Sequence, residues 1–247
     1  MAVTAVRVWR AALDQEGDPH RWLSHEERAR AARYASPDEG RRFAVARAVL
    51  RSVLGEACGL APDEVVIGTE DGGRPIIELC DGRLPSDFPP PDFPPPDLMP
   101  PDFNVSHSGR WALIAVAPPG KRVGVDLEWD GREVDCLAMA RTLFQPAEAE
   151  ALARLEGVWR RREFFRLWTA KEAYVKADGA GVAGLRAVLV DGATARSSAP
   201  SAGFPAELPV RWFSAAPGYP AALVVSGGAE GPAVPAEFEL CDRFLDS

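Results

Sequence analysis

The sequence predicts an α+β protein of two similar lobes, each with helices packed on an antiparallel sheet. Three observations indicate this class. The chain has 247 residues, enough for two modest cores. Segments with helix start and stop signals occur in both halves, and short β-rich runs separated by turn residues follow one another directly. We expect an N-terminal lobe at residues 1–118 and a C-terminal lobe at residues 119–247.

The N-terminal segment predicts one strand followed by two helices. Residues 3–9 alternate well enough between apolar and other side chains for a strand. Ser24 and Ser36 each precede a glutamate by three residues, which is the pattern of a capping box. Proline directly after Ser36 strengthens the second helix start, because its fixed φ suits the first helical position.

The second of these helices lies in an arginine-rich region. We expect the helix to end near Gly59 and to bury one apolar stripe. Between residues 21 and 51 the sequence has eight arginines and four carboxylates, although the whole chain has a net charge of -8. This local contrast predicts an anion-binding flank. The stripe consists of Phe43, Ala46, Leu50, Val53 and Leu54.

A proline-rich insertion at residues 85–101 separates two expected strands. Aspartate recurs every five residues from Asp87 to Asp102, and proline fills most of the positions between. This proline density excludes a helix or an internal strand, so we expect an extended, polyproline-like segment. The segment could bind a partner domain, or it could form a solvated loop.

The rest of the chain reads as strands and helices in alternation. Two β-rich runs flank Ser108-Gly109 and a third follows at residues 124–128, which predicts an antiparallel meander. A helix is expected to begin near Pro146, and a longer one to cover residues 160–176. Strand-like segments then occupy residues 210–215, 220–226 and 237–244.

Composition and charge exclude several classes of function. Sequence-independent nucleic-acid binding requires neutralising many phosphates, which the net negative charge opposes. The four cysteines form no CxxC pair and there are only three histidines, so neither a zinc site nor a disulfide framework is predicted. No signal-like or membrane-spanning apolar run is found. We expect a soluble, cytoplasmic monomer that binds neither nucleic acid nor membrane.

Two carboxylates lie close together in the stretch GVDLEWD. On a strand, Asp126 and Glu128 point to one face, while Val125 and Leu127 point to the other. Like charges this close repel each other unless a cation or water screens them. Solvated edge strands also carry such pairs, so this motif alone leaves both explanations open.

The helix at residues 160–176 offers a third carboxylate. Trp168, Glu172 and Lys176 recur every four residues and share one helix face. Taken alone, the pattern also fits a surface Glu–Lys pair beside a core tryptophan. The chain has only three lysines, however, and two of them lie here, where an ammonium can approach a phosphate as a point charge. With Asp126 and Glu128, Glu172 would complete the all-oxygen site that Mg²⁺ prefers.

Three ordered motifs resemble one known family. FNVSHSGRW at 103–111, GVDLE at 124–128 and FFRLWTAKEAYVKADGAGV at 164–182 are similar in order and spacing to the signature motifs of the 4′-phosphopantetheinyl transferases, specifically the larger surfactin-synthetase-activating type. Residues 23–55 and the GGRP segment at 72–75 resemble the N-terminal lobe of that family. The resemblance implies a pseudo-twofold fold of two fused lobes.

The resemblance also implies an activity. Members of this family transfer the 4′-phosphopantetheine arm of coenzyme A to a serine of acyl or peptidyl carrier protein domains, releasing adenosine 3′,5′-bisphosphate. Carboxylates that match Asp126, Glu128 and Glu172 bind Mg²⁺, which would neutralise charge building on the pyrophosphate. Lys176 would stabilise the same charge, and Lys171 would assist nearby.

Most positions expected to contact coenzyme A lie in the N-terminal lobe. Ser106 and His107 match positions that contact its phosphates, although His107 could equally be a hydrogen-bonded strand histidine. Guanidinium groups suit a 3′-phosphate. Glu27 stands where some relatives carry a basic residue, and its place in a capping box explains the departure. The best-matched basic positions are Arg30, Arg33, Arg42 and Arg74.

Glu148 matches a glutamate proposed in relatives to take the proton of the carrier serine. It also lies in the first turn of a helix, where a carboxylate is favourable whatever its function. A metal-bound water or hydroxide could act as the base instead.

Two rival functions fit parts of the sequence. Another Mg²⁺-dependent phosphotransferase, or a nuclease, would keep the three carboxylates but would not need the Ser-His stretch and the arginine flank together. A non-catalytic interaction protein would use the proline-rich insertion. The three motifs together favour the phosphopantetheinyl transferase, with coenzyme A held in the cleft between the lobes.

Overall fold

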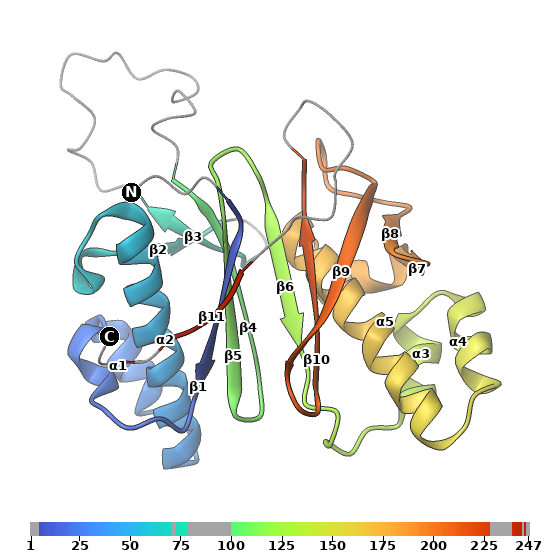
Figure 1. Cartoon of the computed structure of the whole chain (residues 1–247), viewed down its shortest axis with the longest axis horizontal. Coiled ribbons are helices and arrows are strands. Elements are labelled where there is room, and N and C mark those ends of the chain that lie inside the picture. The colour runs from blue at the N-terminus through green and yellow to red at the C-terminus, as the bar shows by residue number, and fades with distance from the viewer. Residues whose placement is uncertain (1–4, 71–72, 79–99, 228–238, 244, 246–247) are drawn as a thin grey trace.

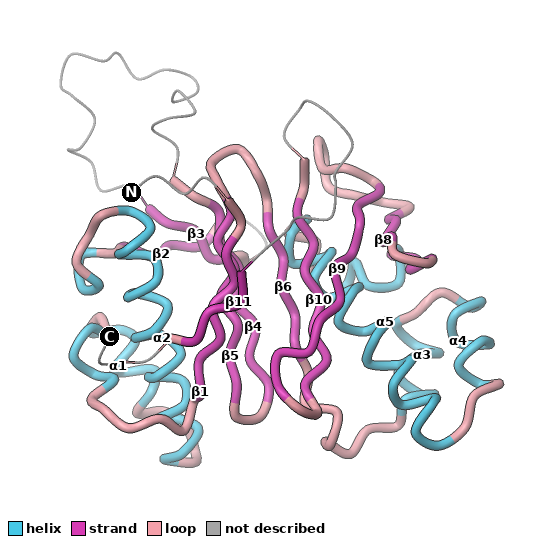
Figure 2. Tube along the Cα trace, in the orientation of Figure 1, coloured by secondary structure: helices cyan, strands magenta, loops and turns pink. Residues whose placement is uncertain are grey.

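Two sheets stand side by side in the middle of the molecule, and one long helix covers the outer face of each (Figure 1). The computed structural model describes residues 5–70, 73–78, 100–227, 239–243 and 245. Helices lie on the two outer sides and most strands lie between them (Figure 2). This arrangement confirms the predicted α+β class. Nearly all of the predicted proline-rich insertion lies outside the described residues.

The N-terminal sheet has the strand order β11-β1-β5-β4. Neighbouring strands run antiparallel except β11, which pairs in parallel with β1. The segment after residue 238 therefore returns to the N-terminal sheet, so the lobe predicted at 119–247 does not contain the last strand. The strands are β1 (Arg7–Ala12), β4 (Asp102–Ser108), β5 (Trp111–Ala117) and β11 (Glu239–Asp242), beside a small hairpin of β2 (Val66–Thr69) and β3 (Pro75–Glu78).

Helices α1 (His25–Ala31) and α2 (Pro37–Cys58) begin where the sequence predicts. Ser24 and Glu27 form a complete capping box. Ser36 makes no side-chain cap, so that part of the prediction is wrong, and the start of α2 rests on Pro37 at the first helical position. Gly59 ends α2 in the left-handed conformation, with φ 68°. Single 3₁₀ turns lie at Pro19–Trp22 and Pro62–Glu64.

The C-terminal sheet is antiparallel throughout, with the order β6-β10-β9-β8-β7. Helix α5 packs on β6 and β10 and extends past the predicted range at both ends. Gly179, with φ 88°, ends it. The elements are β6 (Val123–Leu127), α3 (Cys136–Leu143), α4 (Pro146–Ala153), α5 (Gly157–Asp178), a 3₁₀ helix (Val182–Ala187), β7 (Val188–Asp191), β8 (Thr194–Ser197), β9 (Glu207–Ala216) and β10 (Tyr219–Val225).

Three apolar clusters form the interior: one under α2, one under α5, and one between the two sheets. Helix α5 approaches β6 very closely at Gly124, where a Cβ atom would lie 1.9 Å from the carbonyl oxygen of Ala173. This contact fixes the height of α5 above the strand that carries Asp126. None of the helices in the described residues combines the length and apolar character that crossing a bilayer requires.

Candidate active site

The two sheets meet along β4 and β6, whose contact we call the interlobe seam (residues 102–108 and 123–129). Every second residue of β4 turns a side-chain oxygen toward β6 and accepts a hydrogen bond from a backbone N–H there. Because β6 is an edge strand of its own sheet, these oxygens satisfy donors that backbone pairing leaves open. The bonds run from Val123 to Asp102 (2.7 Å), from Val125 to Asn104 (3.1 Å), from Leu127 to Ser106 (3.4 Å) and from Trp129 to Ser108 (2.9 Å).

Asp126 lies at the centre of the site, on the face of β6 that α5 covers. The alternation expected of a strand is observed: Val125 and Leu127 point into the cluster between the sheets, while Asp126 meets the side chain of Lys176. Only 4% of Asp126 is exposed. A buried carboxylate needs a cation or several donors to remain charged, so its partners decide what this site can do.

One oxygen of Asp126 is well bonded and the other is not. Oδ1 accepts from Nζ of Lys176 at 2.7 Å and from Oγ of Ser106 at 2.7 Å. The Lys176 ammonium also donates to Ser106 (3.0 Å) and to the carbonyl oxygen of Val125 (3.3 Å). Oδ2 is buried and has no hydrogen-bond partner in the described part of the chain. Such an orphan acceptor is rare in folded proteins and marks a place where a water or a cation fits.

Glu128 and Glu172 are close enough to Asp126 for their charges to interact. Burial and the charge of Asp126 raise the pKa of Glu128, opposed by the hydrogen bond from Ser108 and by Arg132. Burial and the same charge raise the pKa of Glu172 to about 7, with Lys176 acting in the opposite direction and Glu128 adding to the rise. The three carboxylates from β6 and α5 therefore share one electrostatic environment.

These carboxylates do not form a ready-made ligand cage. Within the described ranges, no group of three or more histidine, cysteine, aspartate or glutamate side chains could hold a metal ion as it stands. The physical reason is visible in their contacts, since Lys176 and Ser106 occupy Asp126 while Ser108 and Arg132 occupy Glu128. Asp126 and Glu128 are therefore engaged by the chain's own donors.

Glu148 and Lys171 pair with each other in the core of the C-terminal lobe. Lys171 is fully buried, and its Nζ lies 2.7 Å from Oε2 of Glu148 and also donates to the carbonyl oxygen of Val188. Glu148 further accepts from the backbone N–H groups of Gln145 (3.0 Å) and Val190 (2.9 Å). The base role predicted for Glu148 and the phosphate contact predicted for Lys171 would both require this pair to open.

Arg74 is held between the lobes rather than presented to solvent. Its guanidinium makes a bidentate pair with Asp102 at 2.8 and 2.6 Å, and its Nε donates to the carbonyl oxygen of Lys176 at 2.9 Å. Carbonyl oxygens of Phe103 (3.3 Å) and Val123 (3.0 Å) take further bonds. With the side chain 4% exposed, its donors are not available to a phosphate in this conformation.

The other predicted coenzyme A residues lie at the surface of the N-terminal lobe. Arg30 and Arg33 are exposed, and no carboxylate in the described residues pairs with either. Arg42 is bound to Asp14 at 2.8 Å. His107 is exposed, yet loss of surrounding water and the nearby charges of Lys176 and Arg30 keep its pKa below the ordinary value, with Asp126 opposing them.

Three residues with clear roles at the site were not predicted from the sequence. Asp102 anchors Arg74, Ser108 donates to Glu128 at 2.8 Å, and Nη2 of Arg132 lies 3.1 Å from the other oxygen of Glu128. A signal for Ser108 was available: the hydroxyls of VSHS recur with the same two-residue spacing as the carboxylates of VDLE. Asp102 was hidden at the end of the proline-rich repeat.

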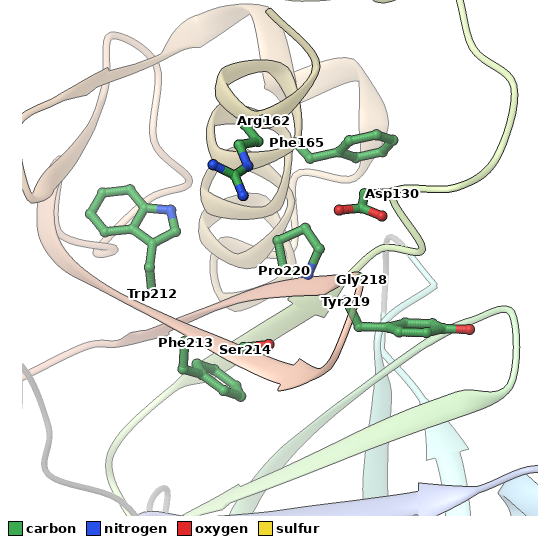
Figure 3. A pocket seen from close by; sticks show the side chains of 9 residues that line it. All are labelled: Asp130, Arg162, Phe165, Trp212, Phe213, Ser214, Gly218, Tyr219 and Pro220. Carbon is green, nitrogen blue, oxygen red and sulfur yellow. The ribbon is translucent and has the colours of Figure 1, made fainter. Parts of the chain in front are cut away.

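A pocket of about 340 Å³ opens between the first half of α5 and the hairpin of β9 and β10. Figure 3 shows Arg162 and Phe165 on α5 facing the hairpin that carries Trp212 and Pro220. None of the predicted site residues lines this pocket. Its lining consists of Asp130, Arg162, Phe165, Trp212, Phe213, Ser214, Gly218, Tyr219 and Pro220.

Comparison with known proteins places both halves of the chain in one family. The model described as "4′-phosphopantetheinyl transferase, N-terminal" matches residues 7–119, and the "4′-phosphopantetheinyl transferase superfamily" model matches residues 122–224. The second match contains Asp126, Glu128 and Glu172.

Individual relatives agree with these models. The 4′-phosphopantetheinyl transferase HetI of Nostoc sp. is 37% identical over 189 residues, which are 75% of this chain and 73% of HetI. A putative 4′-phosphopantetheinyl transferase of Synechocystis sp., slr0495, is 36% identical over 68% of this chain and 62% of its own length. The 4′-phosphopantetheinyl transferase Sfp of Bacillus subtilis is 25% identical over 65% and 62%. The chain thus spans slightly less than two thirds of the last two relatives.

Both lobes, the order of the motifs and the similarity to HetI agree. The chain therefore belongs to the 4′-phosphopantetheinyl transferase superfamily, as an enzyme of the two-lobe type.

Proposed function

We propose that this enzyme transfers the 4′-phosphopantetheine arm of coenzyme A to a serine of an acyl or peptidyl carrier protein domain, with the help of Mg²⁺. The observation that carries the proposal is that Asp126, Glu128 and Glu172, from β6 and α5, lie close enough for the charge of Asp126 to raise the pKa of both glutamates, beside the buried and unpartnered Oδ2 of Asp126. Carboxylates that lie close together repel one another and destabilise the fold, so such a cluster indicates a functional site.

The residues at this patch fit a magnesium ion. All candidate ligands are oxygens, which Mg²⁺ prefers, and Oδ2 of Asp126 is a buried acceptor still lacking a partner. Asp126, Glu128 and Glu172 would hold the ion. When bound, it would supply positive charge to the pyrophosphate oxygens of coenzyme A. The same positive charge would lower the pKa of Glu172, so that this carboxyl group would be ionised at neutral pH.

Lys176 is a cation that this chain itself provides beside Asp126. Its side chain is 26% exposed, so the ammonium can reach a ligand at the surface of the patch. Its three present acceptors are Asp126, Ser106 and the carbonyl oxygen of Val125. Transfer of the ammonium from Asp126 to a pyrophosphate oxygen would keep a hydrogen bond while placing charge where the bond breaks.

The surface beside Lys176 offers a second place for phosphate. Arg30 and Arg33 are exposed and unpaired with carboxylates among the described residues, and Arg30 and Lys176 both act electrostatically on His107. We infer that these groups, with Ser106, receive the phosphates of coenzyme A. Arg42 would join them only after leaving Asp14, and Arg74 would hold the lobes in place for them.

The serine proton of the carrier needs an acceptor. Glu148 keeps its place as a prediction, although its present bond to Lys171 makes it a poor base until that pair separates.

The test is incubation of the full chain with coenzyme A, Mg²⁺ and an apo carrier protein, followed by mass spectrometry of the carrier. We expect one phosphopantetheine added to one serine. The addition should stop in EDTA and in the variant Asp126→Asn, but not in Glu163→Gln, which changes a partly exposed carboxylate on α5 that pairs with Arg166. No addition to any of several carriers would contradict the transfer reaction, and full addition in EDTA would contradict the metal.

A further inference from the structure

We propose that Ser108 is a positioning residue for Glu128, so that the N-terminal lobe orients a carboxylate with which the C-terminal lobe binds its divalent cation. The inference rests on the proposed function for the cation itself. Ser108 lies on β4, whereas Glu128 directly follows β6. Neither the sequence motifs nor the family resemblance assigns a role to this serine.

The hydrogen bonds of Ser108 have a defined direction. Its Oγ accepts from the backbone N–H of Trp129 at 2.9 Å and lies 2.8 Å from Oε2 of Glu128. An N–H group can only donate, so it takes a lone pair of the hydroxyl oxygen. The single hydroxyl proton is then directed to the carboxylate. One oxygen atom of the N-terminal lobe therefore contacts both the backbone and a carboxylate of the C-terminal lobe.

The same unit is repeated one step along the seam. Oγ of Ser106 lies 2.7 Å from the carboxylate of Asp126 and accepts, at 3.4 Å, from the N–H of Leu127. In both units the hydroxyl contacts a carboxylate and the N–H of the residue that follows it. Because each strand repeats every two residues, serines spaced by two align with carboxylates spaced by two.

The other two seam residues show that the choice of serine depends on the carboxylates. Asp102 and Asn104 also accept backbone N–H groups of β6. An aspartate facing Glu128 would repel it, and the acceptor oxygen of asparagine has no proton to give. A hydroxyl can both accept from the backbone and donate to a carboxylate through the same atom. Serine occurs at the two seam positions beside carboxylates.

Glu128 has a second contact, at its other carboxylate oxygen. Nη2 of Arg132 lies 3.1 Å from Oε1, and the side chain of Arg132 is 37% exposed. Arg132 lies on the loop after β6, whereas Ser108 belongs to β4 and is also held by its bond to Trp129. Because Ser108 contacts Oε2, its bond can remain when Oε1 turns to a ligand.

The test compares cation binding in three variants of the full chain. Mn²⁺ binding is followed by electron paramagnetic resonance, with Mg²⁺ as competitor, with and without coenzyme A. Ser108→Ala removes the hydrogen bond to Glu128 and the acceptor of the Trp129 backbone N–H. Asn104→Ala removes the equivalent cap on Val125 but touches no carboxylate, so it is the matched control. Ser108→Thr keeps the hydroxyl.

We expect Ser108→Ala to weaken cation binding by about 10-fold or more, as loss of outer-sphere partners does in other metal sites. Asn104→Ala should lower the melting temperature without a comparable loss of affinity, and Ser108→Thr should bind nearly as the parent does. Should Ser108→Ala fail to fold, Ser108→Cys, a weak donor of similar size, takes its place with the same expectation.

Two outcomes would overturn the inference. One is a loss of affinity in Ser108→Ala no greater than in Asn104→Ala. The other is a folded Ser108→Thr that binds as weakly as the alanine variant. If the parent chain binds neither Mn²⁺ nor Mg²⁺, even with coenzyme A, the proposed metal site fails and the inference fails with it. If the parent chain binds the cation and the Ser108 variants bind it equally well, only the role of Ser108 is rejected and the proposed metal site stands.

Discussion

Glu172 carries a charge that the folded protein disfavours when no cation is present. Its pKa is raised from the ordinary 4.5 to about 7, chiefly by burial and by Asp126. Its protonated form therefore stabilises the folded state fully below about pH 4.5, and this contribution disappears as the pH rises through about 7. The total change is on the order of 3 kcal/mol.

This carboxylate gives a prediction in which stability and activity move in opposite directions. Glu172→Gln, in EDTA, should raise the free energy of unfolding at pH 8 and flatten its pH dependence between about 4.5 and 7. The same variant should lose transfer. Urea unfolding across this pH range checks the first part, with Glu163→Gln as the control on the same helix. A variant less stable than the parent at pH 8 would show that Glu172 is not under repulsion.

The buried pair of Glu148 and Lys171 leads to a second prediction. Lys171→Met should destabilise the protein by about 3–5 kcal/mol, because it leaves a buried carboxylate without its cation. Adding Glu148→Gln in the same chain should recover part of that loss. Thermal unfolding of the two variants checks this. A folded Lys171→Met with parental stability and a large loss of transfer would instead favour the predicted role at the phosphates.

At the scale of elements, the contact of α5 with Gly124 sets the distance between Glu172 and Asp126. In Gly124→Ala the added Cβ would lie 1.9 Å from the carbonyl oxygen of Ala173 and 2.7 Å from the backbone nitrogen of Ala177, so the helix must move outward. We expect the free energy of unfolding to fall by about 1–3 kcal/mol and Mg²⁺ binding to become weaker. Melting temperature and cation titration measure both effects.

Gly68→Ala is the matched control for this change. It also adds a methyl group within a strand, but its nearest neighbour is the flexible side chain of Glu78, which can turn aside. A similar loss of Mg²⁺ affinity in both variants would show that helix height is not what matters at Gly124.

The starts of α1 and α2 and the end of α2 could be predicted from the sequence because their signals are local. The Ser24 capping box and Gly59 lie within a few residues of the ends they mark. The partners of the charged residues could not be predicted in the same way. Nothing in the helical spacing of α5 shows that Lys171 turns toward Glu148 while Lys176 turns toward Asp126, since both follow from how α5 sits on the sheet.

The alternation of Asp126 and Glu128 with apolar neighbours predicted which face of β6 they occupy, and the structure shows that arrangement for Asp126. The partners of these carboxylates were not predictable in the same way, because Asp126 and Glu128 bind side chains from β4, from α5 and from the loop after β6. Arg74 shows the limit most clearly: its partners Asp102 and Lys176 lie 28 and 102 residues away in the chain.

At the scale of the whole molecule, Arg74 fastens the two lobes together. It bonds to Asp102 on β4, to the carbonyl oxygen of Val123 on β6 and to that of Lys176 on α5. Arg74→Ala should lower the free energy of unfolding by about 3–5 kcal/mol, because the partly buried carboxylate of Asp102 loses its cation. Arg74→Lys should recover only part, since lysine cannot make the bidentate pair.

Urea unfolding of both Arg74 variants, with the Michaelis constant for coenzyme A, measures this role. If Arg74 served only to bind coenzyme A, both variants would have a higher Michaelis constant for coenzyme A and an unchanged free energy of unfolding. The parallel pairing of β11 with β1 adds a second tie between the parts of the chain, which a division after residue 118 does not foresee.

The seam has a consequence for how this protein fails. Asp102, Asn104, Ser106 and Ser108 cover the bare edge of β6, and β4 is itself the last strand of its sheet. If heat or urea separates the lobes before either sheet unfolds, the unpaired backbone groups of two edge strands become available for pairing with other molecules. Aggregation of this enzyme should therefore begin with partial opening rather than complete unfolding, and ligands that bridge the lobes should delay it.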